Sequence, residues 1–232
     1  NLLSLNLDST QVGDLTPLSD LKNLQMLSVN FTPVSNIMPL KDLTNLKKVY
    51  CDQTSIKREA ADVFRTASPN VLLIFDSNDL KSWWDTLSPG WRTLFCETAK
   101  IGENPSKEEL VLIPLLNSID LSGRLNILDL EPLRKLPRLQ VINAGRTGIH
   151  NLLPLQNHKE ITSLDISETE VSDISLIREF KNLKVFKADN TKLENIEQVL
   201  NPSLEKIYAD HTAVNDVTAR EFLEKNPQCL LI

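Results

Sequence analysis

Apolar residues recur along the chain in a fixed pattern of steps. From a first apolar position, called n, positions n+3 and n+5 are also apolar, whereas most residues between them are polar. Alternation at period two predicts a short strand in each copy, with the apolar side chains inward and the intervening ones outward. The pattern returns after 22 residues in two runs, and its eight copies begin at Leu2, Leu24, Leu46, Leu116, Leu139, Ile161, Leu183 and Leu204.

Position n+8 holds threonine in seven of these copies. A hydroxyl there can donate a hydrogen bond to the backbone as the chain leaves the strand, so we expect the column to be structural. Its members are Thr10, Thr32, Thr54, Thr147, Thr169, Thr191 and Thr212.

An Asp or Asn followed three residues later by proline comes next in four copies, beginning at Asp14, Asn36, Asp129 and Asn151. Proline presets φ and needs no donor in a first turn, so this pattern predicts a short helical turn on the side opposite the strands. The copies around Ile174 and Ile196 lack the proline. We expect those two turns to be looser.

These positions resemble the leucine-rich-repeat family, and specifically the 22-residue type of internalin-like bacterial proteins, which reads much like L-x-x-L-x-L-x-x-T-x-I-x-D-I-x-P-L. The likeness covers residues 1–74 and 116–232. It implies an α/β fold, a right-handed solenoid with short parallel strands on its concave face, used to bind other proteins. It also slightly favours a location at the cell surface or envelope. The resemblance does not specify the target.

A longer repeat lies on top of the first, because residues 46–74 and 204–232 match in sequence. Each copy ends in an amphipathic helix, near 57–66 and 216–225, followed by an apolar strand. Such a helix and strand would cap an open solenoid end. We therefore predict two tandem modules, 1–74 with a C-terminal cap at about 57–74, and 116–232 with a cap at about 216–232. The first module has no matching front cap, so we expect it to be incomplete at its N-terminal side.

Residues 75–115 break the period and read as helical. Ser88-Pro89 is a typical helix start, and Ser106 with Glu109 has the spacing of a capping box. We predict that this segment is the N-terminal cap of module two, with a core of Trp83, Trp84 and Trp91. The alternative is an exposed aromatic patch that binds a partner, because tryptophan is enriched at binding hot spots. Burial of Trp84 separates these two interpretations.

Composition argues against several classes of function. The net charge is −6 with no basic cluster, which disfavours nucleic acid, and no apolar run approaches the roughly 18 residues of a membrane span. No motif indicates a catalytic site, a metal site or a cofactor. The three histidines lack metal-ligand spacing, and Cys51 and Cys229 are expected to be buried free thiols, with Cys96 facing the helical segment.

Function is therefore expected on the outward strand positions n+2, n+4 and n+6. We predict a non-catalytic interaction scaffold that binds an unknown protein through this concave face, with the two tyrosines as aromatic anchors. The candidate contact residues are Asn6, Ser28, Tyr50, Asp52, Asp120, Asn143, Asp165, Lys187, Tyr208 and Asp210.

Several alternatives remain open for these residues. They can be ordinary solvated strand positions of a structural spacer without a specific ligand, with tyrosine present for its β propensity. The chain can also be the recognition region of a larger enzyme or surface protein. Calcium binding by the acidic members is a weak alternative, because one carboxylate per strand is few for this ion.

Overall fold

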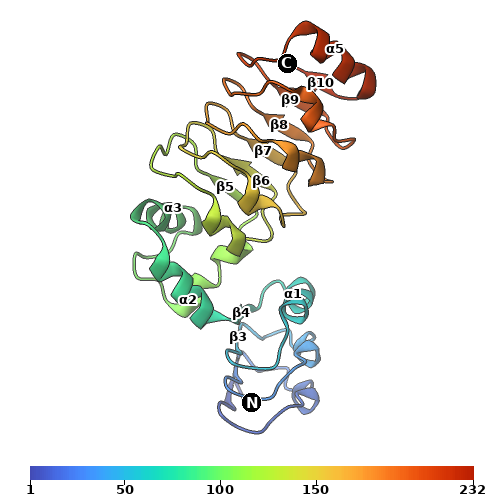
Figure 1. The fold of residues 1–232 in the computed structure, drawn as a ribbon. Helices are drawn as coiled ribbons and strands as arrows, with labels where there is room; N and C mark the ends of the chain where they lie inside the picture. Colours follow the sequence, from blue (N-terminus) through green and yellow to red (C-terminus); the bar gives the residue numbers. More distant parts are fainter. The chain divides into compact units, whose positions relative to one another are not determined.

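Short parallel strands stack into two separate sheets (Figure 1), in a computed structural model that describes residues 1–232. The first sheet has the order β1 (Ser4–Asn6), β2 (Met26–Ser28), β3 (Lys48–Tyr50), β4 (Leu72–Ile74). The second runs from β5 (Ser118–Asp120) through β6 (Val141–Asn143), β7 (Ser163–Asp165), β8 (Val185–Lys187) and β9 (Lys206–Tyr208) to β10 (Leu230–Leu231).

Every predicted copy forms its strand, and each strand spans n+2 to n+4. Matching positions pair across the sheet, as in Leu5 with Leu27 and Leu27 with Val49. The chain is thus an α/β leucine-rich-repeat solenoid, as predicted, with parallel strands alternating with helical turns.

Short 3-10 turns connect the strands on the other side of each repeat. They are η1 (Thr16–Leu18), η2 (Met38–Leu40), η3 (Ile113–Leu115), η4 (Glu131–Lys135), η5 (Leu153–Leu155), η6 (Ser175–Glu179) and η7 (Ile196–Val199).

An Asx side chain begins six of these turns by accepting the backbone N–H two residues later, at 2.8–3.1 Å. Asp173 and Asn195 do so in η6 and η7, which have no proline. The expectation that these two copies are looser is therefore wrong. The side-chain acceptor defines the start of the turn, and proline is dispensable.

The threonine column is structural, as predicted. In all seven copies the n+8 hydroxyl donates to the carbonyl oxygen of n+5, at 2.6–2.9 Å. The residue at n+7 has a positive φ in all eight copies, although the only glycine among them is Gly123, in the copy that lacks the threonine. This left-handed residue turns the chain out of the sheet, and the threonine hydroxyl holds the bend that follows.

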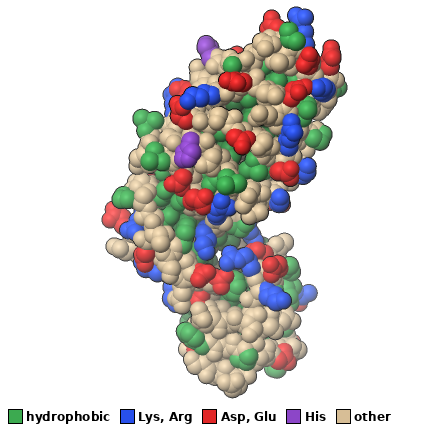
Figure 2. Space-filling view, in the orientation of Figure 1, with side chains coloured by type: hydrophobic (Ala, Val, Ile, Leu, Met, Phe, Trp, Pro, Cys, Tyr) green, Lys and Arg blue, Asp and Glu red, His purple; other side chains and the backbone are tan.

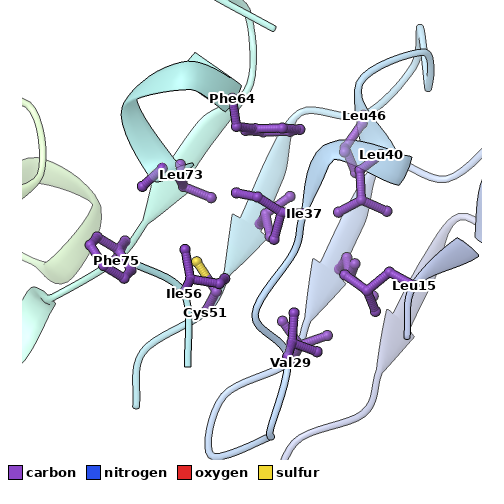
Figure 3. Packing of buried hydrophobic residues seen from close by; sticks show 14 of the residues in the cluster. Leu15, Val29, Ile37, Leu40, Leu46, Cys51, Ile56, Phe64, Leu73 and Phe75 are labelled. Carbon is purple, nitrogen blue, oxygen red and sulfur yellow. The ribbon is translucent and has the colours of Figure 1, made fainter. Parts of the chain in front are cut away.

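Leucine, isoleucine and valine fill the space between strands and turns. In the core behind the first sheet, Ile37, Leu40 and Phe64 are fully buried in one cluster (Figure 3). Val49 belongs to the same cluster and is also fully buried. Cys51 also lies in this core, and burial raises the pKa of its thiol well above the usual range. The core thus continues from copy to copy through contacts between equivalent positions.

The duplicated module ends are alike in structure. Helices α1 (Arg58–Ala67) and α5 (Asp216–Lys225) occupy the predicted places and each buries one phenylalanine, Phe64 or Phe222. The last strands are held in the same way. Leu72 N–H donates to the Lys47 carbonyl at 2.8 Å, and Leu230 N–H donates to the Glu205 carbonyl at 2.8 Å.

In chain order, α2 (Ser77–Thr86), α3 (Pro89–Ala99) and α4 (Lys107–Leu110) follow β4 and precede β5. Helix α3 starts at Ser88-Pro89 as predicted, and Ser106 and Glu109 form the predicted capping box. The chain divides into two compact units, Asn1–Thr86 with Asn104–Val111, and Leu87–Glu103 with Leu112–Ile232. Helices α2 and α4 therefore belong to the first unit and α3 to the second.

The tryptophans follow this division. Trp84 is 2% exposed and belongs to the first unit, whereas Trp91 is 3% exposed, stacks on Phe95 and belongs to the second. Burial of Trp84 argues against the exposed aromatic patch. Trp83 and Trp84 belong to the first unit and Trp91 to the second, so the predicted tryptophan core is divided between the two units. Whether residues 75–115 act as the front cap of the second module stays a prediction.

Replacing Thr169 by valine tests the threonine column. Valine keeps the shape but leaves the buried Ile166 carbonyl without its hydroxyl donor. We expect a loss of about 1–2 kcal/mol in the free energy of unfolding of the second unit, measured by urea denaturation. Thr169→Ser restores the donor and should recover most of that loss. Equal stability of the valine variant and the wild type would contradict the structural role.

The acidic turn residues make stability depend on pH. The backbone N–H and the hydroxyl of Ser175 lower the pKa of Asp173 below its usual ~3.9. A lowered folded-state pKa gives stability that is present above pH ~4 and is lost as pH falls through the folded value. Asp173→Asn keeps the acceptor and removes the titration. We expect NMR titration to give a depressed Asp173 pKa, and acid unfolding of the Asn variant to be less steep.

Candidate functional site

Three of the predicted contact residues come together on the second sheet, at its outward strand positions. Asp165, Lys187 and Tyr208 stand at n+4 of the neighbouring strands β7, β8 and β9. Lys187 Nζ lies 3.8 Å from Asp165 Oδ2 and 5.4 Å from the centre of the Tyr208 ring. The ammonium group thus bridges a carboxylate and an aromatic face, which makes one continuous charged and aromatic cluster.

Asp120 and Asn143 continue this n+4 column on β5 and β6. One side-chain oxygen of each accepts the N–H two residues later, as the Asp165 carboxylate also does, at 2.9–3.2 Å. In the first unit Asn6 makes the same bond to Asp8 N–H at 2.8 Å. These side chains therefore fix the end of their strand and still present their remaining polar atoms on the sheet face.

A second polar column runs along n+6 of the first sheet. Asp8 Oδ1 accepts Asn30 N–H at 2.7 Å, and Asn30 Oδ1 accepts Asp52 N–H at 2.8 Å. Ser28, another predicted contact residue, donates its hydroxyl to Asp8 Oδ1 at 2.6 Å. The side-chain oxygens of this column accept backbone N–H groups of the next repeat, so they continue the hydrogen bonding between repeats beyond the ends of the strands.

The structure differs from the sequence expectation at Asp52. This side chain was expected to face outward, but it is 3% exposed. Its carboxylate accepts the backbone N–H of Ser77, the first residue of α2, at 2.8 Å, and also the Ser77 hydroxyl. Lys107 Nζ lies 3.3 Å from Asp52 Oδ2. Asp52 thus caps α2 from a neighbouring repeat, where its negative charge suits the helix N-terminus.

Tyr50 is also engaged within the first unit. Its hydroxyl donates to Glu108 Oε1 of α4 at 2.6 Å. This hydrogen bond, with partial burial, raises the pKa of Tyr50 to about 12, and it lowers the pKa of Glu108. No sequence signal marks this contact, because it depends on residues 104–111 returning to the first unit after α3.

The duplicated counterparts remain accessible. Asp210 is exposed, and its carboxylate makes no hydrogen bond or ion pair; only its backbone N–H is bonded, to Asp189 Oδ1 at 2.9 Å. Tyr208 is half-buried and its hydroxyl makes no hydrogen bond. The contacts of Tyr50 and Asp52 are made by α4 and α2, which follow β4 in the chain.

Three side chains with reactive groups are buried, namely His158, Cys51 and Cys229. His158 is buried and its Nε2 donates to the Leu133 carbonyl oxygen at 2.9 Å. Burial raises the pKa of the Cys229 thiol, which is free like Cys51, while Cys96 is only partly buried. No group of three or more His, Cys, Asp and Glu side chains is placed to hold a metal ion. None of the helices has the length and apolar character needed to cross a membrane.

Charges of both signs are mixed on the surface. On the face drawn in Figure 2, acidic and basic side chains intersperse over the second unit, with no large patch of one sign. Exposed ion pairs join neighbouring repeats, as in Arg146 with Glu168 at 2.8 Å. Attraction by this surface is therefore local rather than long-range.

No protein-family model and no curated protein matches the chain. Among solved structures, it is similar to an internalin, InlF, from Listeria monocytogenes, with 17% identity over 98% of this chain and a TM-score of 0.45. It is similar to internalin C2 of the same organism, with 20% identity over 100% of this chain and 72% of that one, at a TM-score of 0.39. The functional domain of InlJ, also from Listeria monocytogenes, matches at 15% identity over 99% of this chain and 52% of that one, with a TM-score of 0.33. The chain spans 59% of the length of the InlF structure.

The two copies of the acidic residue provide a matched test. Asp52→Ala leaves the first-turn N–H of α2 and the Ser77 hydroxyl without their acceptor, so we expect a loss of about 2–3 kcal/mol in the stability of α2. Asp210→Ala removes an exposed side chain and should change stability by less than about 0.5 kcal/mol. Hydrogen exchange of residues 77–86 measures the first effect. Similar results for both variants would contradict the different roles assigned to them.

Proposed function

We propose that this chain is a non-catalytic protein-binding scaffold that contacts its partner through the concave face of the second sheet. The observation that carries the proposal is the cluster of Asp165, Lys187 and Tyr208 on three neighbouring strands. Lys187 contacts both of the other side chains, and all three are partly exposed. A partner therefore meets an ordered surface and loses little side-chain freedom on binding.

The chemistry of this cluster suits a protein partner. A tyrosine provides a rigid apolar surface with a polar tip, and charged groups around it fix the orientation of the partner. Val141, at n+2 on the same sheet, adds an exposed apolar side chain. Asn143 and Asp120 extend the polar surface along β6 and β5, and Asn6 and Ser28 provide similar positions on the first sheet.

Catalysis has little support from the residues present. The buried thiols have raised pKa values, which disfavour the thiolate that a cysteine nucleophile needs. His158 is buried and its Nε2 is bonded to a backbone carbonyl oxygen. A location at the cell surface or envelope stays a prediction from the sequence.

A triple variant tests the binding face. Asp165→Asn keeps the acceptor for Ser167 N–H, while Lys187→Ala and Tyr208→Ala remove the ammonium group and the ring. Loss of a binding hot spot should weaken a protein partner by about thirtyfold or more. The measurement is capture and cross-linking of proteins from the producing cells, followed by affinity measurement with the purified partner.

The control variant carries Glu170→Gln and Lys192→Ala. These residues form an exposed ion pair after the strands, so the control also removes one charge of each sign. We expect it to bind like the wild type, and both variants to unfold near the wild-type temperature. Equal binding by the triple variant would refute the assignment of this face, and capture of no specific protein would favour the spacer role.

A further inference from the structure

A groove opens among the helical turns of the second unit, on the side of the repeats opposite the strands. It runs over the start of η5, with η4 on one side and η6 on the other. The turns pack in pairs, η4 on η5 and η6 on η7, and η5 has three residues whereas η4 and η6 have five. The short turn between two longer ones leaves a hollow of about 560 Å³.

Leucine side chains form the apolar part of this groove. Leu152 is buried at its base, Leu176 is half-buried, and Leu153 is 60% exposed. Leu153 stands at n+14, where the next repeat has Ser175. A leucine that keeps most of its surface in water gains free energy when an apolar group covers it. The groove therefore offers apolar contact area to another molecule.

The polar part of the groove is acidic. Glu131, Asp173 and Glu179 line it, and no lysine, arginine or histidine does. Arg134 pairs with Glu131 at 2.6 Å and neutralises that carboxylate. Asp173 accepts the N–H of Ser175 with one oxygen, and neither Asp173 nor Glu179 forms an ion pair. The groove therefore keeps two negative charges that the chain does not compensate.

The basic neighbour of Glu179 in sequence is directed elsewhere. Arg178 donates from its guanidinium to the carbonyl oxygens of Glu197 and Gln198, at 2.8 and 3.1 Å. These two bonds hold the guanidinium toward η7, away from the lining of the groove. The carboxylates of the groove are therefore open to a cation from another molecule.

We propose that this groove binds a segment of a partner protein that carries arginine or lysine beside an apolar side chain. The guanidinium or ammonium group pairs with Asp173 and Glu179, and the apolar side chain packs on Leu153 and Leu176. Charge complementarity selects a basic segment, and the leucines select an apolar residue next to the cation. Turn residues alone build this surface, so it is a second binding face beyond the strand face of the proposed function.

The probe is a fluorescent hexapeptide of alternating leucine and arginine, titrated into the full chain. Fluorescence anisotropy measures its affinity, and the shifts of backbone amide signals in NMR spectra of the isotope-labelled chain locate it. We expect weak, saturable binding with shifts centred on residues 151–153 and 173–179. Raising the salt concentration from about 0.05 M to about 0.5 M should weaken binding severalfold, because salt screens exposed charges.

Variants of the chain test the acidic and the apolar part separately. Asp173→Asn with Glu179→Gln keeps the acceptor for Ser175 N–H and removes both charges, so the affinity should fall by about fivefold to tenfold. Leu153→Ser introduces the residue of the next repeat and should weaken binding by about fivefold. Glu160→Gln is the matched control, because it removes an exposed carboxylate outside the groove and should leave the affinity unchanged.

Three results would overturn the inference: no saturable binding up to millimolar peptide, equal binding of a peptide with glutamine in place of arginine, or amide shifts on the strands instead of the turns. The test is independent of the proposed function. The triple variant of Asp165, Lys187 and Tyr208 should bind the peptide like the wild type. Loss of peptide binding in that variant would assign the peptide to the strand face and reject the groove.

Discussion

Each repeat completes its backbone hydrogen bonding only through the repeat beside it, and the rest of the structure depends on this constraint. A strand of three residues has no stability by itself, so it exists because parallel neighbours satisfy its N–H and C=O groups. The left-handed residue at n+7 extends the ladder, as when Glu168 N–H donates to the Asp189 carbonyl at 2.8 Å. Threonine and Asx side chains then bond backbone C=O and N–H groups that lie outside the strands. At the two ends of each sheet, the outermost strand has a neighbouring strand on one side only. After the last regular repeat of each sheet, one helix and one more strand follow.

Most of the fold was predictable because it depends on short-range patterns. Strand positions, the threonine bonds and the limits of α5 follow from spacing and from side chains that act within three or four residues. The turns at Ile174 and Ile196 are not looser, because the Asx acceptor, and not proline, forms the start of the turn.

The candidate site was less predictable, because burial on a sheet face depends on which distant segment returns to it. Alternation along the strands correctly brings Asp165, Lys187 and Tyr208 together. It places Tyr50 and Asp52 equally well, yet these two are occupied by α4 and α2. The matching local sequence places Tyr208 and Asp210 at the same positions of the repeat as Tyr50 and Asp52. The contacts of Tyr50 and Asp52 come from residues 77–86 and 104–111, and no periodic signal encodes the path of these segments.

The left-handed position at n+7 tolerates changes of side chain. Serine, phenylalanine, glutamine, arginine, glutamate, asparagine and histidine all occupy it here, because the neighbouring repeats impose the backbone conformation. The side chain at this position points away from the core, and the turn does not depend on its type. A row of positions along one edge of each sheet thus accepts side chains of very different size and charge without a change of fold. The solenoid can acquire new surface chemistry there one repeat at a time, while its interior stays constant.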